Sequence, residues 1–260
     1  MRITGFSKNN LQLLRLLVKQ ELTLRYKRSV IGIGWTLLNP ILTSFVLWIV
    51  FSFLFAGKLQ SGQLFAPYLM AGILLSTFFN QGLLQAANSI ASNGGVLTKV
   101  AVPPKIFAYA AALAALINFL IGLIPLAIVV CFSGQTLKAT LPIVLVIGLL
   151  LAIFISGIGL TLSVIFIRFE DSKNIVGVLL LILVYLTPVF YPIGILSSQM
   201  QQIVNLNPLT SFLDAFRWSF SNNSIVTIGD FIYIFIVSCS VFIFGSYFFN
   251  KRWSKTIAML

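Results

Sequence analysis

The sequence has few of the side chains on which acid–base chemistry depends. It contains no histidine, and its 260 residues include only five acids, namely Glu21, Glu170, Asp171, Asp214 and Asp230. General acid–base catalysis draws mainly on histidine and carboxylates, so the chain holds little material for it. Glu170 and Asp171 are adjacent, but neighbouring side chains in a loop project apart. A solvated turn, in which Asp171 or Ser172 caps the next helix, is the favoured interpretation.

Cysteine and charge are also scarce. Cys131 and Cys239 both lie in apolar runs, which predicts small buried side chains and neither a disulfide framework nor a metal site. Charged residues make up 8% of the chain, hydrophobic residues 59%, and the mean hydropathy is +1.04. Because roughly a quarter of the residues of soluble domains are charged, this composition predicts an all-α, multi-pass membrane protein. The first apolar run is too long for a signal peptide, so we expect no cleavable leader.

Six stretches are long enough to cross a hydrocarbon core, which requires about 20 apolar residues. They lie near residues 30–56, 64–91, 106–132, 141–167, 175–193 and 231–249. Pro40 should bend the first stretch without ending it. Pro188 and Pro192 should break the fifth before it leaves the bilayer. The second stretch has a polar side formed by Asn80, Gln81, Gln85 and Asn88. Polar side chains are costly against lipid, so we expect this side to face protein or a water-filled path.

A short helix is predicted after the fifth stretch, where Asn207 caps and Pro208 starts it. Its apolar residues recur at intervals of three and four: Leu209, Phe212, Leu213, Phe216 and Phe220. Asp214 and Arg217 are expected on the opposite side. A helix of about a dozen residues is too short to span, which favours a re-entrant or interfacial helix.

The basic residues predict the orientation in the membrane. With a cytoplasmic N-terminus, one side holds fourteen of the seventeen Lys and Arg residues, and the other side holds Lys58, Lys138 and Arg217. This asymmetry favours cytoplasmic termini and an even number of spans. The formal net charge is +12, and the basic residues that cause it lie beside apolar spans. We therefore expect them to contact anionic lipid headgroups and not nucleic acid.

Residues 8–27 form a basic amphipathic segment that continues directly into the first span. Lys8, Gln12, Arg15, Lys19, Thr23 and Tyr26 share one face at 100° per residue, which is typical of an interfacial helix. The alternative is a charged flank that only orients the first span.

The connection between the second and third spans carries apolar residues that a simple tether does not need. Val96, Leu97, Val100 and Val102 alternate there with Lys99, and Lys105 follows the double proline. An apolar, mildly basic loop facing the cytosol is typical of a docking surface for a soluble partner. The alternative is a short interfacial helix that contacts only lipid.

Aromatic residues are dense along the spans, and most are expected to face lipid or anchor the interfaces. Some could instead line a path for a sugar chain, because flat apolar faces stack on sugar rings. The candidates are Trp35, Phe45, Trp48, Tyr185, Phe190 and Tyr191. Trp35 and Tyr191 are the better ones, since each adjoins a predicted helix irregularity.

The chain lacks the phosphate-binding loop GxxxxGK[ST], so any nucleotide-driven step requires another chain. The glycine pairs at Gly32 and Gly34 and at Gly157 and Gly159 are expected within apolar helices, where they allow close packing. Intramembrane carboxylates suited to a proton relay are also lacking, which disfavours an ion-coupled mechanism.

Four motifs occur in order along this six-span pattern: RYKRSVIG at 25–32 with Trp35 and Leu38-Asn39-Pro40, Lys99-Val100 with the following prolines, TPVFYP at 187–192, and LNPLT at 206–210 leading to Phe216 and Arg217. In this order they resemble the permease subunits of ABC-2 type exporters of cell-surface polysaccharides, which serve O-antigen, capsule and teichoic acid.

The resemblance implies one transmembrane domain over residues 1–260, in a bacterial cytoplasmic (inner) membrane. It implies a homodimer joined to two cytosolic ATPase subunits, which would bind ATP and Mg; no cofactor or metal is expected on this chain. Residues 8–27 would be an interface helix and 94–105 a coupling helix that contacts the ATPase, through Val96, Leu97, Lys99, Val100 and Lys105. Spans one and five would border a channel that the outer gate helices of 194–222 help to close.

The implied cargo is a glycan on a polyprenyl pyrophosphate carrier. Arg25, Lys27 and Arg28 are our candidates for attracting the pyrophosphate head group at the cytoplasmic interface. Two alternatives stay open: an ABC-2 permease for a drug or small lipid, and, from another class, a membrane-embedded glycosyl- or phosphotransferase that uses Glu170 and Asp171.

Overall fold

The protein is an all-α bundle. The computed structural model describes residues 8–26, 31–32, 34–54, 65–100, 102–132, 140, 142–220 and 226–257. Within those residues the regular elements are α1 (Lys8–Tyr26), α2 (Gly34–Leu54), α3 (Phe65–Ser92), α4 (Gly94–Leu97), α5 (Lys105–Phe132), α6 (Ile143–Arg168), α7 (Ser172–Leu186), the 3-10 turn η1 (Ile193–Ile195), α8 (Ser198–Asn205), α9 (Pro208–Trp218) and α10 (Ile228–Thr256). The predicted all-α fold class is confirmed.

Four of the described helices, α3, α5, α6 and α10, are long and apolar enough to cross a bilayer. They coincide with the predicted second, third, fourth and sixth spans. The other two predicted spans contain shorter apolar stretches, Leu37–Val50 in α2 and Ser172–Leu186 in α7. The count of six spans therefore stays a prediction.

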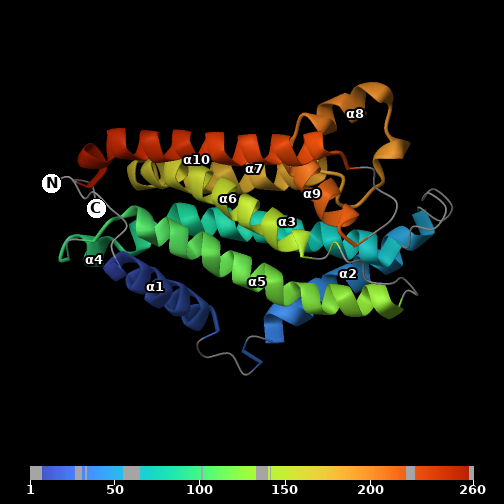
Figure 1. Cartoon of the computed structure of the whole chain (residues 1–260), viewed down its shortest axis with the longest axis horizontal. Coiled ribbons are helices and arrows are strands. Elements are labelled where there is room, and N and C mark those ends of the chain that lie inside the picture. Colours follow the sequence, from blue (N-terminus) through green and yellow to red (C-terminus); the bar gives the residue numbers. More distant parts are fainter. Residues whose placement is uncertain are drawn as a thin grey trace.

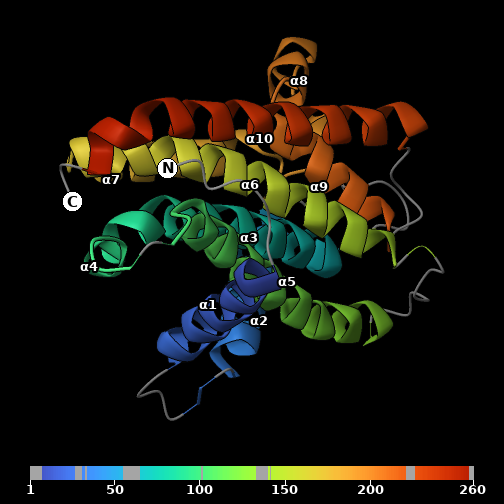
Figure 2. The same cartoon turned by 60° about the vertical axis from the view of Figure 1, so that its left-hand side comes forward.

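The long helices pack side by side with α3 and α6 at the centre. Helix α10 packs on α6, α6 on α3, and α3 on α5, while α1 and α2 cover α5 and α3 on the other side (Figure 2). Helix α7 touches α3 and α6 only lightly, and Leu180 is its one buried residue. Most of α7 is therefore free to contact lipid or another chain.

Glycine allows α6 to pack closely on α10 and on α3. A Cβ at Gly157 would lie 2.6 Å from the Val241 carbonyl oxygen, and one at Gly159 would lie 2.6 Å from the Ala86 Cβ. The predicted packing role of this pair is confirmed. The same prediction is wrong for Gly32, which precedes α2 in a turn with a φ of +57° that glycine adopts at no steric cost.

Proline and asparagine set the helix boundaries as expected. Helix α2 continues through Pro40, and α7 ends at Leu186, just before Thr187 and Pro188. The Asn207 side chain caps α9 by accepting a hydrogen bond from the Leu209 amide at 3.0 Å. The predicted cap on α7 is wrong, because Asp171 makes no capping hydrogen bond and the Ser172 hydroxyl donates back to the Phe169 carbonyl.

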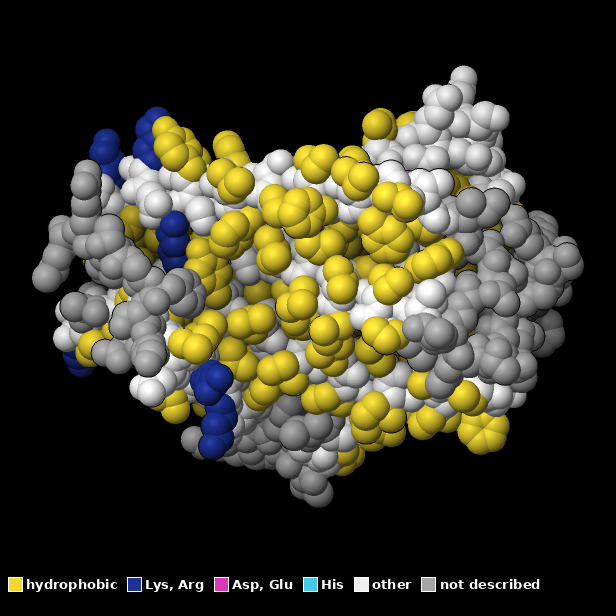
Figure 3. Space-filling view, viewed as in Figure 1, with side chains coloured by type: hydrophobic (Ala, Val, Ile, Leu, Met, Phe, Trp, Pro, Cys, Tyr) yellow, Lys and Arg dark blue, Asp and Glu magenta, His cyan; other side chains and the backbone are white. Residues whose placement is uncertain are grey.

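The two ends of the bundle differ in chemistry. The start of α1, α4 and the end of α10 lie at one end, and α8 and α9 lie at the other (Figure 1). On the face shown in Figure 3, apolar side chains cover the middle, and Lys and Arg gather toward the α4 end. This distribution suits a bundle in a bilayer with its basic end at one surface; which surface is cytoplasmic stays a prediction.

Candidate functional site

A cluster of hydrogen bonds surrounds the break that follows α7. The backbone becomes extended at Thr187, and Thr187, Pro188 and Val189 are all buried. Carbonyl groups beyond the end of a helix have lost their helical partners, and a buried one requires another donor. The structure supplies these donors from α3 and α9.

Arg217 on α9 is the main donor. Its Nη1 donates to the Pro188 carbonyl at 2.9 Å, and its Nη2 lies 3.2 Å from the carbonyls of both Val189 and Tyr68. The guanidinium also stacks on the Tyr68 ring, with Cζ 3.4 Å from the ring centroid. We call these four residues, Arg217, Tyr68, Pro188 and Val189, the Arg217 clasp.

Helix α3 is shaped to accept the clasp. The Tyr68 hydroxyl donates toward the Tyr191 carbonyl at 2.8 Å and the Pro188 carbonyl at 3.1 Å. One turn later, a Cβ at Gly72 would lie 2.9 Å from Val189 Cγ1 and 3.0 Å from Arg217 Nη2. Glycine therefore leaves the room that the guanidinium and the extended chain occupy.

A second link joins the break to the cap of α9. The Asn207 Nδ2 donates to the Thr187 hydroxyl at 2.8 Å, and that hydroxyl donates to the Leu183 carbonyl at 2.8 Å. One asparagine thus caps α9 with its oxygen and holds the end of α7 with its nitrogen.

The predicted faces of α9 are correct for the apolar residues and wrong for Arg217. Leu209, Phe212, Leu213, Phe216 and Phe220 are buried, but Arg217 is only 6% exposed and lies among them instead of opposite. Asp214 is mostly buried as well. Burial raises the pKa of its carboxyl above the ordinary value, and the charge of Arg217 offsets part of that rise.

The candidate path aromatics form two separate groups. At the end of α7, the Tyr185 and Phe190 rings lie 5.9 Å apart, and the Tyr191 hydroxyl donates to the Tyr185 carbonyl at 3.0 Å. On α2, the Phe45 and Trp48 rings stack 6.3 Å apart and are 55% and 41% exposed. Trp35, at the start of α2, is exposed too.

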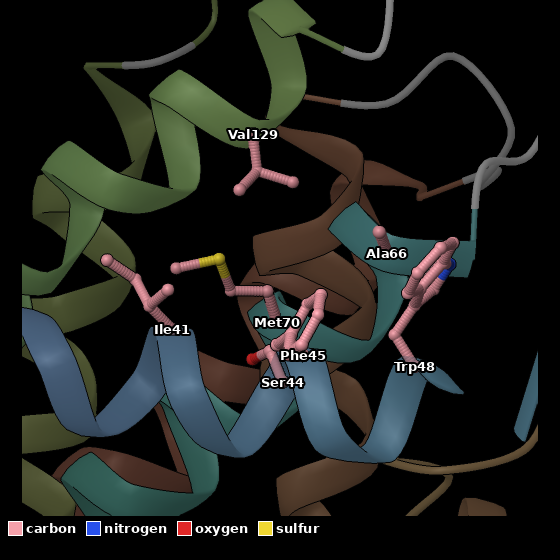
Figure 4. A pocket seen from close by; sticks show the side chains of 7 residues that line it. All are labelled: Ile41, Ser44, Phe45, Trp48, Ala66, Met70 and Val129. Atoms are coloured by element: carbon pink, nitrogen blue, oxygen red, sulfur yellow. The ribbon is translucent and has the colours of Figure 1, made fainter. Parts of the chain in front are cut away.

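Phe45 and Trp48 line a pocket between α2, α3 and α5. It has a volume of about 250 Å³ and almost wholly apolar walls, formed by Ile41, Ser44, Phe45, Trp48, Ala66, Met70 and Val129 (Figure 4). The buried Ser44 hydroxyl has no hydrogen-bond partner among the described residues. Such walls suit a hydrocarbon chain better than a sugar.

The polar side of α3 faces mostly inward. Asn80, Gln85 and Asn88 are half-buried, and the Asn88 side chain donates to the Leu84 carbonyl at 2.9 Å, whereas Gln81 is exposed. The expectation that this side avoids lipid holds for three of its four residues.

The predicted docking loop is only partly exposed. Among the described residues of 94–105, helical geometry covers Gly94–Leu97, and Lys105 already begins α5, so no single helix extends over the predicted 94–105. Val96, Lys99 and Val100 are exposed, whereas Leu97, the last residue of α4, is buried in the core. Lys105 turns to α10, where its Nζ donates to the Ser246 carbonyl at 3.2 Å.

The amphipathic helix α1 packs its apolar side on the bundle. Leu13, Leu14 and Leu17 contact the core, and Arg15 and Lys19 are exposed. Of the head-group candidates, Arg25 lies in the last turn of α1; its side chain, Lys27 and Arg28 lie outside the described residues.

Nothing in the described part of the chain gathers acids for chemistry. No group of three or more Cys, Asp or Glu residues that could hold a metal ion occurs among the described residues. Glu170 and Asp171 are exposed in the turn between α6 and α7.

Comparison with known proteins assigns most of the chain to one family. Residues 12–221 match the family described as "ABC-2 type transporter". The chain belongs to this family of transporter membrane subunits. It is 28% identical over 204 residues to the O-antigen export system permease protein RfbA of Myxococcus xanthus, covering 77% of each chain.

Two further relatives of this ABC-2 type chain match over nearly their whole length. Identity to the RfbA of Klebsiella pneumoniae is 24% over 243 residues, which is 92% of this chain and 91% of the relative. Identity to the capsule polysaccharide export inner-membrane protein CtrC of Neisseria meningitidis serogroup B is 25% over 236 residues, or 88% and 86% of the two chains.

The clasp is the feature that sequence reasoning missed. Arg217 and Tyr68 are 149 positions apart, so no local pattern pairs them. The available signal was an arginine within a strongly apolar helix next to a proline break, since ionisable residues in such surroundings usually find specific partners.

Proposed function

We propose that this chain is the channel-forming subunit of an ATP-driven exporter that moves lipid-linked cell-surface polysaccharide across the bacterial inner membrane. The observation that carries the proposal is the similarity, over most of the chain, to proteins named as O-antigen and capsule export permeases. The membership in the ABC-2 type family supports transport, and the relatives' names support a glycan as cargo.

The proposed complex is a homodimer with two copies of a cytosolic ATPase subunit. Within each chain α2 packs on α3 and α5, and most of α7 faces away from the bundle. Pairing two chains through these helices would cover their exposed apolar residues and border a channel with Tyr185, Phe190 and Tyr191.

In the proposed mechanism, the ATPase acts on the basic end of the bundle. ATP binding in the partner would move residues 8–27 and 94–105 as levers and open the path between α2 and α7. The pyrophosphate head of the cargo would be attracted by Arg25, Lys27 and Arg28.

The choice of cargo can be tested by stimulation of ATP hydrolysis. The chain is purified with its ATPase, placed in vesicles, and supplied with polyprenyl-pyrophosphate-linked glycan or with amphipathic drugs. Glycan-specific stimulation is the expected result. Stimulation by drugs or small lipids alone would instead support a different ABC-2 cargo, and a glycosyl- or phosphotransferase would form product without any ATPase.

Charged substitutions test whether the loop around Val96 and Val100 docks the ATPase. Val96→Asp combined with Val100→Asp places two carboxylates on exposed apolar positions, so we expect loss of the ATPase during copurification while the permease stays folded. Leu206→Asp, an exposed position at the opposite end, is the matched control and should keep the ATPase. Retention of the ATPase by the double variant would contradict the proposed surface.

The head-group site has its own test. Replacing Arg25, Lys27 and Arg28 with glutamine should lower export while the complex with the ATPase persists. The matched control neutralises three exposed cations at the end of α10, Lys251, Arg252 and Lys255. Equal export from the two variants would contradict the head-group site.

A further inference from the structure

The Arg217 clasp ties the segment after α7 to α3 and α9, two helices that already pack against each other in the bundle. Its residues come from α3, from the break after α7, and from α9. The helix α7 makes few other contacts with the bundle. The position of the segment 187–191 relative to α3 therefore depends on these hydrogen bonds, together with the buried Val189 side chain and the bond between Asn207 and Thr187.

The clasp is expensive to build, which argues for a specific purpose. Taking a guanidinium out of water is costly unless it is paired, and Arg217 is paired with backbone carbonyls and one aromatic face. A neutral donor would satisfy one or two carbonyls. Only the planar fork of arginine can reach Pro188, Val189 and Tyr68 together.

The held segment carries two of the path aromatics. Phe190 follows Val189 directly, and the Tyr191 carbonyl accepts from the Tyr68 hydroxyl. The Tyr191 hydroxyl in turn reaches back to Tyr185. Fixing the backbone of residues 188–191 thus restricts where the Phe190 and Tyr191 side chains can lie, and the Tyr191 hydroxyl links them to the Tyr185 carbonyl.

We propose that Arg217 is a positioning residue for the export path: through the Pro188 and Val189 carbonyls it fixes Phe190 and Tyr191 at the end of α7, where they border the route of the glycan. This inference rests on the proposed function for the meaning of the path. The geometric half of it, that the clasp holds residues 188–191 in place, needs no cargo.

A cargo-free experiment tests the geometric half. In a chain with Cys131→Ala and Cys239→Ala, Phe190→Cys introduces a half-buried thiol whose rate of reaction with a maleimide reports the position of the segment. Adding Arg217→Met should raise that rate severalfold. Tyr68→Phe removes one donor and leaves the guanidinium, so it should raise the rate less.

The control separates local release from general unfolding. Leu206→Cys, directly after α8, 79% exposed and outside the clasp, should react at the same rate with and without Arg217→Met. If Arg217→Met does not fold, Tyr68→Phe alone decides the matter. Unchanged labelling of Phe190→Cys in every folded clasp variant would overturn the proposal.

A disulfide rescue tests whether the role is positional or electrostatic. Residues 72 and 189 are close enough to be bridged, and Arg217→Met removes the nitrogen that would crowd a side chain at residue 72. In the Arg217→Met chain, Gly72→Cys with Val189→Cys should restore glycan export after oxidation and lose it after reduction. Failure of a formed disulfide to restore export would overturn the positioning role.

The two proposals fail in different ways. If labelling responds as expected but the parent chain and its ATPase export no glycan, the proposed cargo is wrong and the clasp stands as a structural device. If the parent exports glycan and Arg217→Met exports it equally well, the positioning proposal is wrong and the proposed function is untouched.

Discussion

The bond between Asn207 and Thr187 should stabilise the protein independently of the helix cap that the same asparagine provides. The Asn207 Oδ1 accepts from the Leu209 amide at 3.0 Å, and its Nδ2 donates to the Thr187 hydroxyl at 2.8 Å. Asn207→Ser keeps a capping oxygen and loses the donor to Thr187, which should cost about 1 kcal/mol. Asn207→Ala also loses the cap, worth about 1 kcal/mol more.

Thermal unfolding of the purified chain measures both losses. At about 2–4 °C per kcal/mol for a chain of this size, Asn207→Ala should lower the Tm by about 4–8 °C and Asn207→Ser by about half of that. Thr187→Val removes the other partner of the same bond, so the double variant with Asn207→Ser should be more stable than additivity predicts, by about 1 kcal/mol. Additive losses, or a serine variant as stable as the parent, would refute this reasoning.

Three further predictions concern packing, charge and the path. Gly157→Ala should lower the Tm because its Cβ would meet the backbone of α10, whereas Gly177→Ala, with nothing within 4 Å, should keep or slightly raise it; equal Tm values would contradict the close contact. Because the raised pKa of Asp214 makes the folded state bind a proton more tightly than the unfolded state, its contribution to stability falls as the pH rises from the ordinary carboxyl pKa through the raised one. Asp214→Asn should therefore show a smaller loss of Tm between acidic and neutral pH than the parent, and parallel pH profiles would contradict the shift. Trp35→Ala and Tyr191→Ala should slow export without loss of folded protein, and normal export from both would place these aromatics at lipid-facing positions.

Local patterns predicted the elements that local interactions determine. The sequence Asn207-Pro208 and the spacing of the apolar residues that follow placed α9 correctly, because the cap and the helical face need only neighbours along the chain. The proline break after α7 was predicted for the same reason, since the ring of Pro188 restricts the residue before it.

Long-range contacts determined what the sequence did not reveal. Arg217 lies inside because carbonyls 28 and 29 positions away need a donor, which no helical periodicity expresses. Leu97 is buried because α4 is a single turn packed against the bundle. Gly94 and Gly95 within the turn and the two prolines that follow it disfavour a longer helix.

Some residues near the candidate site could be named from the sequence, but their arrangement could not. The order of motifs indicated the family correctly. The aromatic residues near the break could be named from their position, whereas their orientation depends on Tyr68, which belongs to a helix more than a hundred positions away. Exposure of Val96 and Val100 followed from their setting in a short connection between two spans.

Glycan movement measured directly in vesicles tests the central claim best. The purified chain is placed in vesicles with or without its ATPase, fluorescent lipid-linked glycan is added to the outside, and the accumulation of glycan in the lumen is followed after ATP addition. The account predicts accumulation only when the chain, the ATPase and ATP are present together, from complexes whose ATPase faces outward. Glycan that moves, or is chemically changed, by the chain alone would contradict it.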